Sequence, residues 1–87
     1  MKQFDTIRES IFEYVKKSSL NDLSKLNGTT QLFKEGIFDS MAFVLLIDYI
    51  EESFGILPGD DDLVEENFET IDAITSYIIR KKEVMAL

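Results

Sequence analysis

Residues 40–54 read SMAFVLLIDYIEESF, and this stretch decides the fold class. Five of its apolar residues recur with the period of an α-helix and form one stripe: Phe43, Leu46, Ile47, Ile50 and Phe54. Gly55 follows directly, and a glycine at this position is typical of a helix C-cap. The stretch therefore predicts a helix from Ser40 to Phe54 that packs one face on a core.

The same helix carries a second surface outside that stripe. Its members are three apolar residues followed by three acids: Met41, Val44, Leu45, Asp48, Glu51 and Glu52. A helix that is apolar on two sides is either covered by another segment or presents a binding site. The pattern leaves both interpretations open, namely burial under residues 19–39 or a docking surface for a partner.

Two further segments have the apolar spacing of amphipathic helices. The first covers residues 5–18, and Asp5 or Thr6 is expected to cap its start. The last covers residues 70–82, with Thr70 as N-cap and basic residues at the negative end of the helix dipole. Their buried stripes are predicted to contain Phe4, Ile7, Ile11, Phe12, Val15, Ile71, Ile74, Tyr77 and Ile78.

The remaining segments are irregular or short. Residues 19–39 form a long loop, which scattered apolar residues hold on the core and which includes a turn of helix at residues 21–26. Residues 60–66 are expected to form a short acidic turn of helix, and no strand pattern is present. The prediction for residues 1–87 is a single all-α domain. It is a four-helix bundle with a short third helix and a long loop between helices one and two.

The composition excludes several classes of function. The 87 residues include no cysteine and no histidine, which removes disulfides, thiolate metal sites and the commonest general base. The net charge of −8 makes nucleic acid and anionic membranes poor partners. Residues 41–47 are the longest apolar run and are too short to span a bilayer, and the N-terminus lacks a signal-peptide pattern. We predict a cytoplasmic monomer without membrane insertion.

Residues 59–62, read as GDDD, raise the question of a calcium site. An EF-hand loop needs oxygen ligands at alternate positions and a glycine at the sixth. Counted from Asp60, the fifth position is Val64 and the sixth is Glu65, so the pattern fails. No glycine-rich phosphate loop is present either. These patterns therefore predict no metal site and no catalytic residue.

Residues 36–41, read as GIFDSM, hold the remaining candidate. A serine after an aspartate at a helix start is typical of capping. The hexapeptide also resembles the attachment motif of the acyl carrier and peptidyl carrier protein superfamily: Gly, two mostly apolar residues, Asp, Ser and a large apolar residue. Residues 50–56 look like the end of that family's second helix, and residues 66–74 look like the start of its last helix.

The resemblance implies that Ser40 receives 4′-phosphopantetheine from coenzyme A through a separate phosphopantetheinyl transferase, and that Asp39 serves transferase recognition. The resemblance further implies that the protein carries an acyl or aminoacyl group as a thioester from a loading ligase to downstream pathway enzymes and is not itself an enzyme. A helix N-terminus suits such an arm, because its unpaired N–H groups and positive dipole end favour a phosphodiester. Partner binding is expected on the second surface of residues 40–54, from Met41 to Glu52.

The sequence departs from the fatty-acid carriers at Ala42 and Leu45, near which those proteins often have acids. Residues 66–68, read as ENF, look more like stand-alone carriers of specialised pathways, D-alanyl carrier proteins or peptidyl carriers. Bulky side chains are expected to fill the space that a long acyl chain needs, and these are Phe43, Phe54 and Phe68. The alternative from another class is an unmodified acidic helical domain for protein–protein interaction, which does not need Ser40.

Overall fold

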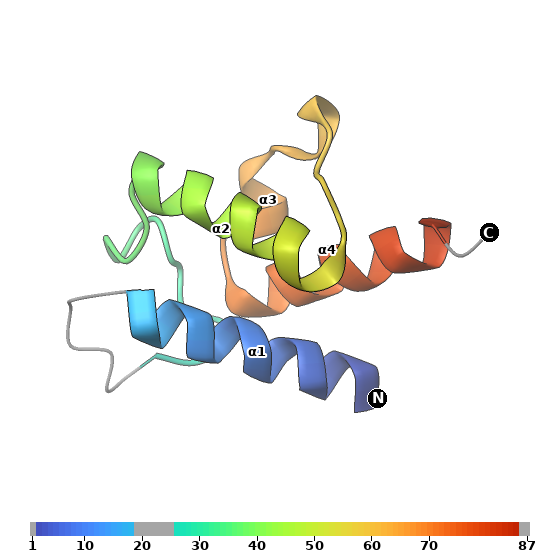
Figure 1. The fold of residues 1–87 in the computed structure, drawn as a ribbon. Coiled ribbons are helices and arrows are strands. Elements are labelled where there is room, and N and C mark those ends of the chain that lie inside the picture. Colours follow the sequence, from blue (N-terminus) through green and yellow to red (C-terminus); the bar gives the residue numbers. More distant parts are fainter. Residues whose placement is uncertain (1, 19–25, 86–87) are drawn as a thin grey trace.

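The computed structural model describes residues 2–18 and 26–85, and its regular elements are all helical over this part of the chain (Figure 1). In chain order they are α1 (Lys2–Ser18), α2 (Ser40–Phe54), the 3-10 turn η1 (Asp60–Asp62), α3 (Glu65–Phe68) and α4 (Ile71–Met85). The predicted class is confirmed, because four α-helices are present, the third is short, and a long segment separates the first two.

α1 and α4 pack against each other and supply most of the core. Most of the predicted stripes is confirmed by these buried side chains: Ile7, Ile11, Val15, Ile71, Ile74, Tyr77 and Ile78. Phe12 is only partly buried against the core, and Phe4 is partly exposed and is not among the core residues. An ion pair joins the two helices, with Arg8 Nε at 2.7 Å from Asp72 Oδ1. Hydrophobic burial along two long helices, rather than this half-exposed ion pair, holds them together.

Two helix ends differ from the prediction. α1 begins at Lys2, so Asp5 lies inside its first turn and neither Asp5 nor Thr6 is its cap. α4 continues to Met85 rather than ending near residue 82, because nothing in its last turn breaks a helix. Its predicted cap is confirmed, since the Ala73 N–H donates to Thr70 Oγ1 at 3.0 Å.

Backbone hydrogen bonds hold the connection between α1 and α2 on the core. The Leu32 N–H donates to the Glu69 carbonyl at 2.8 Å, and the Leu32 carbonyl accepts from Ile37 and Phe38 at 2.9 and 3.0 Å. Leu32 and Phe38 are buried, which confirms that apolar residues hold this segment in place. The predicted turn at residues 21–26 lies outside the described residues, apart from Leu26.

The predicted acidic turn at residues 60–66 is two elements, η1 and α3, and Asp62 ties η1 to α4. Asp62 Oδ2 accepts from Tyr77 Oη and from Lys81 Nζ, both at 2.9 Å. The Lys81 contact first and the Tyr77 hydroxyl second hold the pKa of Asp62 below its ordinary value. Burial, reinforced by the bond to Asp62, raises the pKa of Tyr77.

Candidate attachment site and docking surface

The segment from Gly36 to Asp39, directly before α2, positions Ser40 at the start of the helix. Gly36 has a φ of 75°, a left-handed conformation that favours glycine, and it turns the chain. Phe38 is then buried in the core and anchors the segment. Asp39 follows as the N-cap of α2, with extended backbone and with Oδ1 accepting from the Ala42 N–H at 2.8 Å. The sequence folds this way because each of these positions supplies one requirement of a tight helix start.

Ser40 is therefore not the cap of α2, and the capping interpretation is corrected to Asp39. The aspartate carboxylate reaches the first-turn N–H, so Ser40 takes the first helical position instead. Ser40 is exposed, and its hydroxyl makes no hydrogen bond within the described part of the chain. The first turn of α2 itself contains no acid, and the N-cap Asp39 supplies a negative charge at the positive dipole end beside Ser40.

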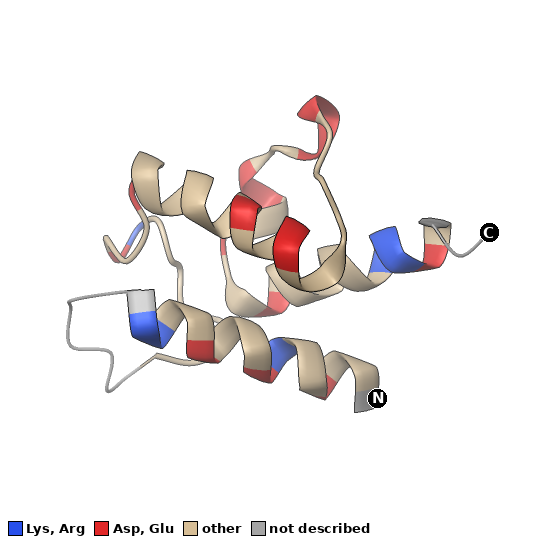
Figure 2. Ribbon diagram, viewed as in Figure 1, with Lys and Arg blue, Asp and Glu red and all other residues tan. Residues whose placement is uncertain are grey.

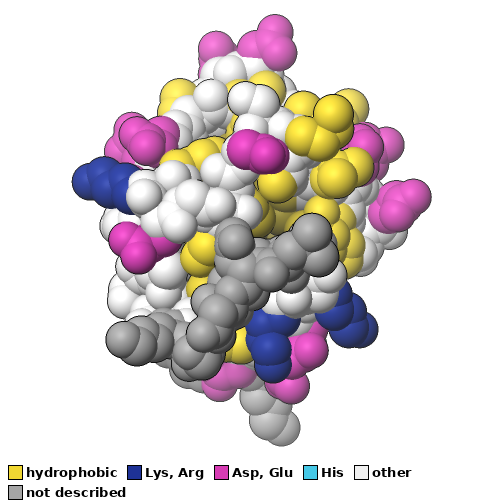
Figure 3. Space-filling model, turned by 90° about the vertical axis from the view of Figure 1, so that its left-hand side faces the viewer, with side chains coloured by type: hydrophobic (Ala, Val, Ile, Leu, Met, Phe, Trp, Pro, Cys, Tyr) yellow, Lys and Arg dark blue, Asp and Glu magenta, His cyan; other side chains and the backbone are white. Residues whose placement is uncertain are grey.

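The second surface of α2 is open to solvent. Met41, Val44 and Leu45 are 68%, 55% and 51% exposed, so burial under the preceding segment is wrong for these side chains. Asp48, Glu51 and Glu52 are exposed as well, and acids colour the second half of α2 (Figure 2). Seen from the side where α2 begins, hydrophobic side chains gather over one area with acidic side chains along its edge (Figure 3). The surface thus grades from apolar, next to Ser40, to acidic.

The three phenylalanines predicted to fill one space do not all meet. The rings of Phe43 and Phe68 pack edge to face at 5.2 Å between centroids. Phe54 lies at the far end of α2 and packs on Tyr49 instead, at 6.1 Å. Only Phe43 and Phe68 therefore face a common space, because Phe54 is three helical turns away from Phe43.

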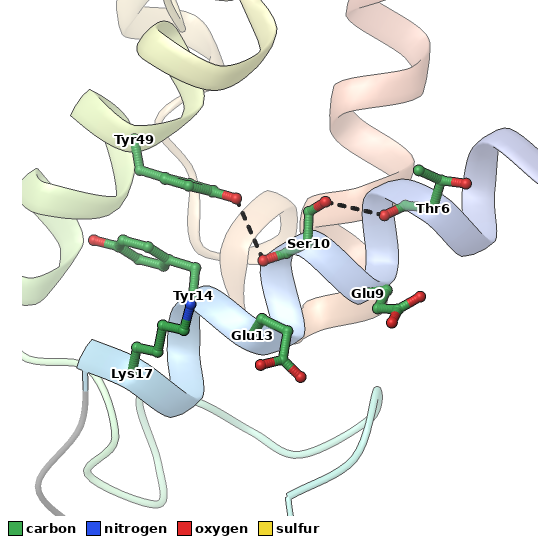
Figure 4. Close-up of a pocket in the computed structure, with 7 residues that line it drawn as sticks. All are labelled: Thr6, Glu9, Ser10, Glu13, Tyr14, Lys17 and Tyr49. Atoms are coloured by element: carbon green, nitrogen blue, oxygen red, sulfur yellow. Dashed lines mark hydrogen bonds between the residues drawn. The ribbon is translucent and has the colours of Figure 1, made fainter.

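A hollow of about 460 Å³ lies between α1 and α2 (Figure 4). Tyr14 and Tyr49 stack there with centroids 4.2 Å apart, and Tyr49 Oη donates to the Ser10 carbonyl at 3.3 Å. Neither tyrosine was predicted to line a site, since Tyr49 falls outside the main stripe of α2. The hollow is also lined by Glu9, Glu13 and Lys17. Because it contains both negative and positive side chains, it does not select a ligand by the sign of its charge.

Two features are absent from residues 2–18 and 26–85. Among them, no group of three or more acidic, histidine or cysteine side chains is placed to hold a metal ion. No helix in this part of the chain has the length and apolarity that crossing a bilayer requires.

A small helical domain whose second helix is capped by an aspartate and begins with an exposed serine has the form of a carrier protein. No family model matches the chain. It is 30% identical over 77 residues to the D-alanyl carrier protein of Lactococcus lactis subsp. lactis (strain IL1403), covering 88% of this chain and 98% of that protein. The D-alanyl carrier protein of Lactococcus lactis subsp. cremoris (strain MG1363) is 29% identical over the same length.

The chain belongs to the carrier protein family, which confirms the resemblance seen in residues 36–41 and downstream. Carrier proteins are non-catalytic, so membership also confirms that the chain is not an enzyme. A chain in a solved structure described as a crystal structure of an FAD-dependent dehydrogenase has a TM-score of 0.72 and 25% identity. The match covers 78% of this chain and 97% of that one, so the matched chain is the shorter of the two.

Proposed function

We propose that the protein carries an acyl or aminoacyl group as a thioester on a 4′-phosphopantetheine arm attached to Ser40. The observation that carries this proposal is that Asp39 and Ser40 have separate roles at the start of α2. Asp39 caps the helix, and Ser40 is left exposed. The homology to D-alanyl carrier proteins supports it. The arm also supplies the thiol that a chain without cysteine lacks.

Attachment is a phosphoryl transfer by a separate phosphopantetheinyl transferase. The Ser40 oxygen forms a bond to the β-phosphorus of coenzyme A and loses its proton. The bond from this phosphorus to the oxygen that bridges the two phosphates breaks, and 3′,5′-ADP leaves with the electron pair. The product is a phosphodiester at a helix N-terminus, whose N–H groups and dipole favour the negative charge. Asp39 is proposed to help the transferase recognise this start of α2, in addition to its capping bond.

The proposed cargo is an aminoacyl group of the D-alanyl kind, loaded by an adenylating ligase. The names of the two Lactococcus relatives support this choice over a fatty acyl group. A flexible arm then delivers the thioester to downstream enzymes at high effective concentration. A cytoplasmic, monomeric protein remains the prediction for such a carrier.

The proposed docking surface is the second surface of α2, made of Met41, Val44, Leu45, Asp48, Glu51 and Glu52. Its apolar end adjoins the attachment serine, and its acidic end lies further along the helix. Partners are therefore expected to offer an apolar contact beside the entrance for the arm and basic side chains beyond it.

The match to a chain in the dehydrogenase structure favours a second class of partner. That chain is shorter than this one and shares its helical fold, which leaves no room for a dinucleotide-binding sheet. We infer that an FAD-dependent dehydrogenase can act on the carried group, removing a hydride and a proton as FAD becomes FADH₂. Mixing loaded carrier with such an enzyme tests this, with loss of flavin absorbance as the expected result.

Intact mass measurement tests the attachment. The protein is incubated with coenzyme A and a broad-specificity phosphopantetheinyl transferase, and a mass increase of one phosphopantetheine group is expected. The increase should disappear in Ser40→Ala. It should persist in Ser53→Ala, a matched control that removes an exposed serine from the other end of α2. Absence of any increase with several transferases favours the unmodified interaction domain instead.

A further inference from the structure

An apolar hollow opens beside the attachment serine. It has a volume of about 300 Å³ and is lined by Phe33, Phe43, Leu63, Val64, Glu65 and Phe68. Phe43 stands three residues after Ser40 on α2, and side chains at that spacing are neighbours on a helix surface. Phe43, which lines one side of the hollow, therefore lies about one helical turn from Ser40.

Interlocked aromatic rings close the floor of the hollow. Phe43 packs edge to face on Phe33 at 5.8 Å and on Phe68 at 5.2 Å, and Phe68 packs on Tyr77 at 5.2 Å. Phe68 is fully buried, as are Leu46 and Ile50 on the core side of α2. Moving the Phe43 ring aside would break contacts on both of its flanks, so the hollow does not continue into the core.

The depth of this hollow matters for the kind of group that the arm can hold. A long acyl chain in water is unfavourable in proportion to its exposed apolar area, so a protein that carries one gains by burying it. A short aminoacyl group has a charged ammonium and little apolar area, and it gains nothing from such burial. A shallow hollow with a rigid floor is suited to the second kind of cargo.

We propose that Phe43, packed between Phe33 and Phe68, closes the hollow to acyl chains, so that a group carried on Ser40 stays exposed to solvent and the protein is suited to short acyl or aminoacyl cargo. This proposal rests on the proposed function, and it adds the residue that determines specificity. Leu63 and Val64 also line the hollow, and each is 42% exposed, so both lie at its rim.

The test compares how well the protein shields a short and a long thioester. Acetyl-, alanyl- and octanoyl-phosphopantetheine are transferred from the corresponding coenzyme A thioesters, and the mass increase shows first that Ser40 is modified. Cleavage by hydroxylamine is then timed against the same free coenzyme A thioester. For each group, the cleavage rate on the protein is divided by the rate for the free coenzyme A thioester. In the wild type, these three ratios should agree within about twofold, which corresponds to a difference in activation free energy too small to reflect burial. Strong protection of the octanoyl group in the wild type overturns the proposal.

The variant Phe43→Ala removes the floor. Its octanoyl thioester should be cleaved at least about fourfold more slowly, the shift that burial of one methylene gives, with the acetyl rate unchanged. Phe54→Ala is the matched control, because it removes a ring from the same helix outside the hollow. If Phe43→Ala does not fold, Phe43→Leu takes its place, and a folded variant without added protection contradicts the role of Phe43. A protein that accepts no phosphopantetheine at all contradicts the proposed function instead.

Discussion

α2 and α4 are equally long, with 15 residues each, but they use their apolar residues differently. α2 is the more apolar helix, yet only Leu46 and Ile50 on it are buried. α4 is less apolar in composition, yet three of its four isoleucines, Ile71, Ile74 and Ile78, are fully buried. Apolar side chains on α4 therefore stabilise the fold. Those on the open surface of α2 contribute little to stability, and their value lies in binding.

The sharpest test of this contrast is a pair of alanine substitutions, one on each helix. Ile78→Ala removes a fully buried side chain from α4 and should lower the free energy of unfolding by about 2–5 kcal/mol, through lost transfer energy and a cavity. Leu45→Ala on α2 should change it by less than about 0.5 kcal/mol, because half of that side chain is already in water. Urea unfolding of both variants measures this.

The same pair should give the opposite order in a binding assay. Leu45→Ala is expected to raise the KM of the phosphopantetheinyl transferase for the carrier, while folded Ile78→Ala leaves it unchanged. A large loss of stability in Leu45→Ala would show that α2 is a structural helix like α4, and the proposed docking surface would lose its basis.

Gly28 tests how the connection before α2 is attached to the α1–α4 pair. Its carbonyl accepts from the Asp72 N–H at 3.0 Å, and an added Cβ would collide with the side chains of Arg8 and Asp72. Asp72 is short and held by the ion pair, so it cannot move aside without breaking that pair. Gly28→Ala should therefore cost about 1–3 kcal/mol of unfolding free energy.

Gly59→Ala is the matched control for this substitution. Its nearest neighbour would be Asp62 Oδ2 at 3.9 Å, an ordinary contact, and its backbone is in an extended conformation. Thermal unfolding should separate the two variants clearly. Equal melting temperatures would mean that the connection is not fixed at Gly28.

The sequence predicted α2 to the residue, because a strong apolar stripe ends at a glycine that has the required left-handed φ of 69°. It could not fix the start of α1, where capping residues inside the helix imitate a terminus. The role of Ser40 was also open, since Asp39 and Ser40 are both capping residues and only the backbone geometry chooses between them. The exposed surface of α2 could not be predicted either, because whether a loop covers a helix depends on tertiary packing.

Asp39 allows capping of α2 to be separated from recognition by the transferase. Asp39→Ala removes the acceptor for the Ala42 N–H and should lower the unfolding free energy by about 1 kcal/mol. Asp39→Asn keeps a capping oxygen and should retain nearly all of it. If the carboxylate itself is recognised, modification of Ser40 should nevertheless slow in Asp39→Asn. Equal modification rates in wild type and Asp39→Asn would restrict Asp39 to its structural role.

The smallest expected effect is a pH dependence at the attachment of η1 to α4. Lys81 and then Tyr77 lower the pKa of Asp62 from its ordinary 3.8, so this group adds stability above pH 3.8 and loses it as the pH falls further, through the folded-state pKa. The pKa of Tyr77 is raised from its ordinary 10.0 by burial and then by Asp62, so its contribution is complete below pH 10 and declines above it. Wild type should therefore lose stability at both extremes through this contact.

Asp62→Asn tests the loss of stability in acid, and Tyr77→Phe tests the loss of stability in alkali. Urea unfolding over a pH series measures both. The stability advantage of wild type over Asp62→Asn should be constant near neutral pH and should shrink below pH 3.8. In Tyr77→Phe, the free energy of unfolding should fall less above pH 10 than it does in the wild type. Parallel curves for wild type and Asp62→Asn in acid would mean that η1 is not held by its carboxylate.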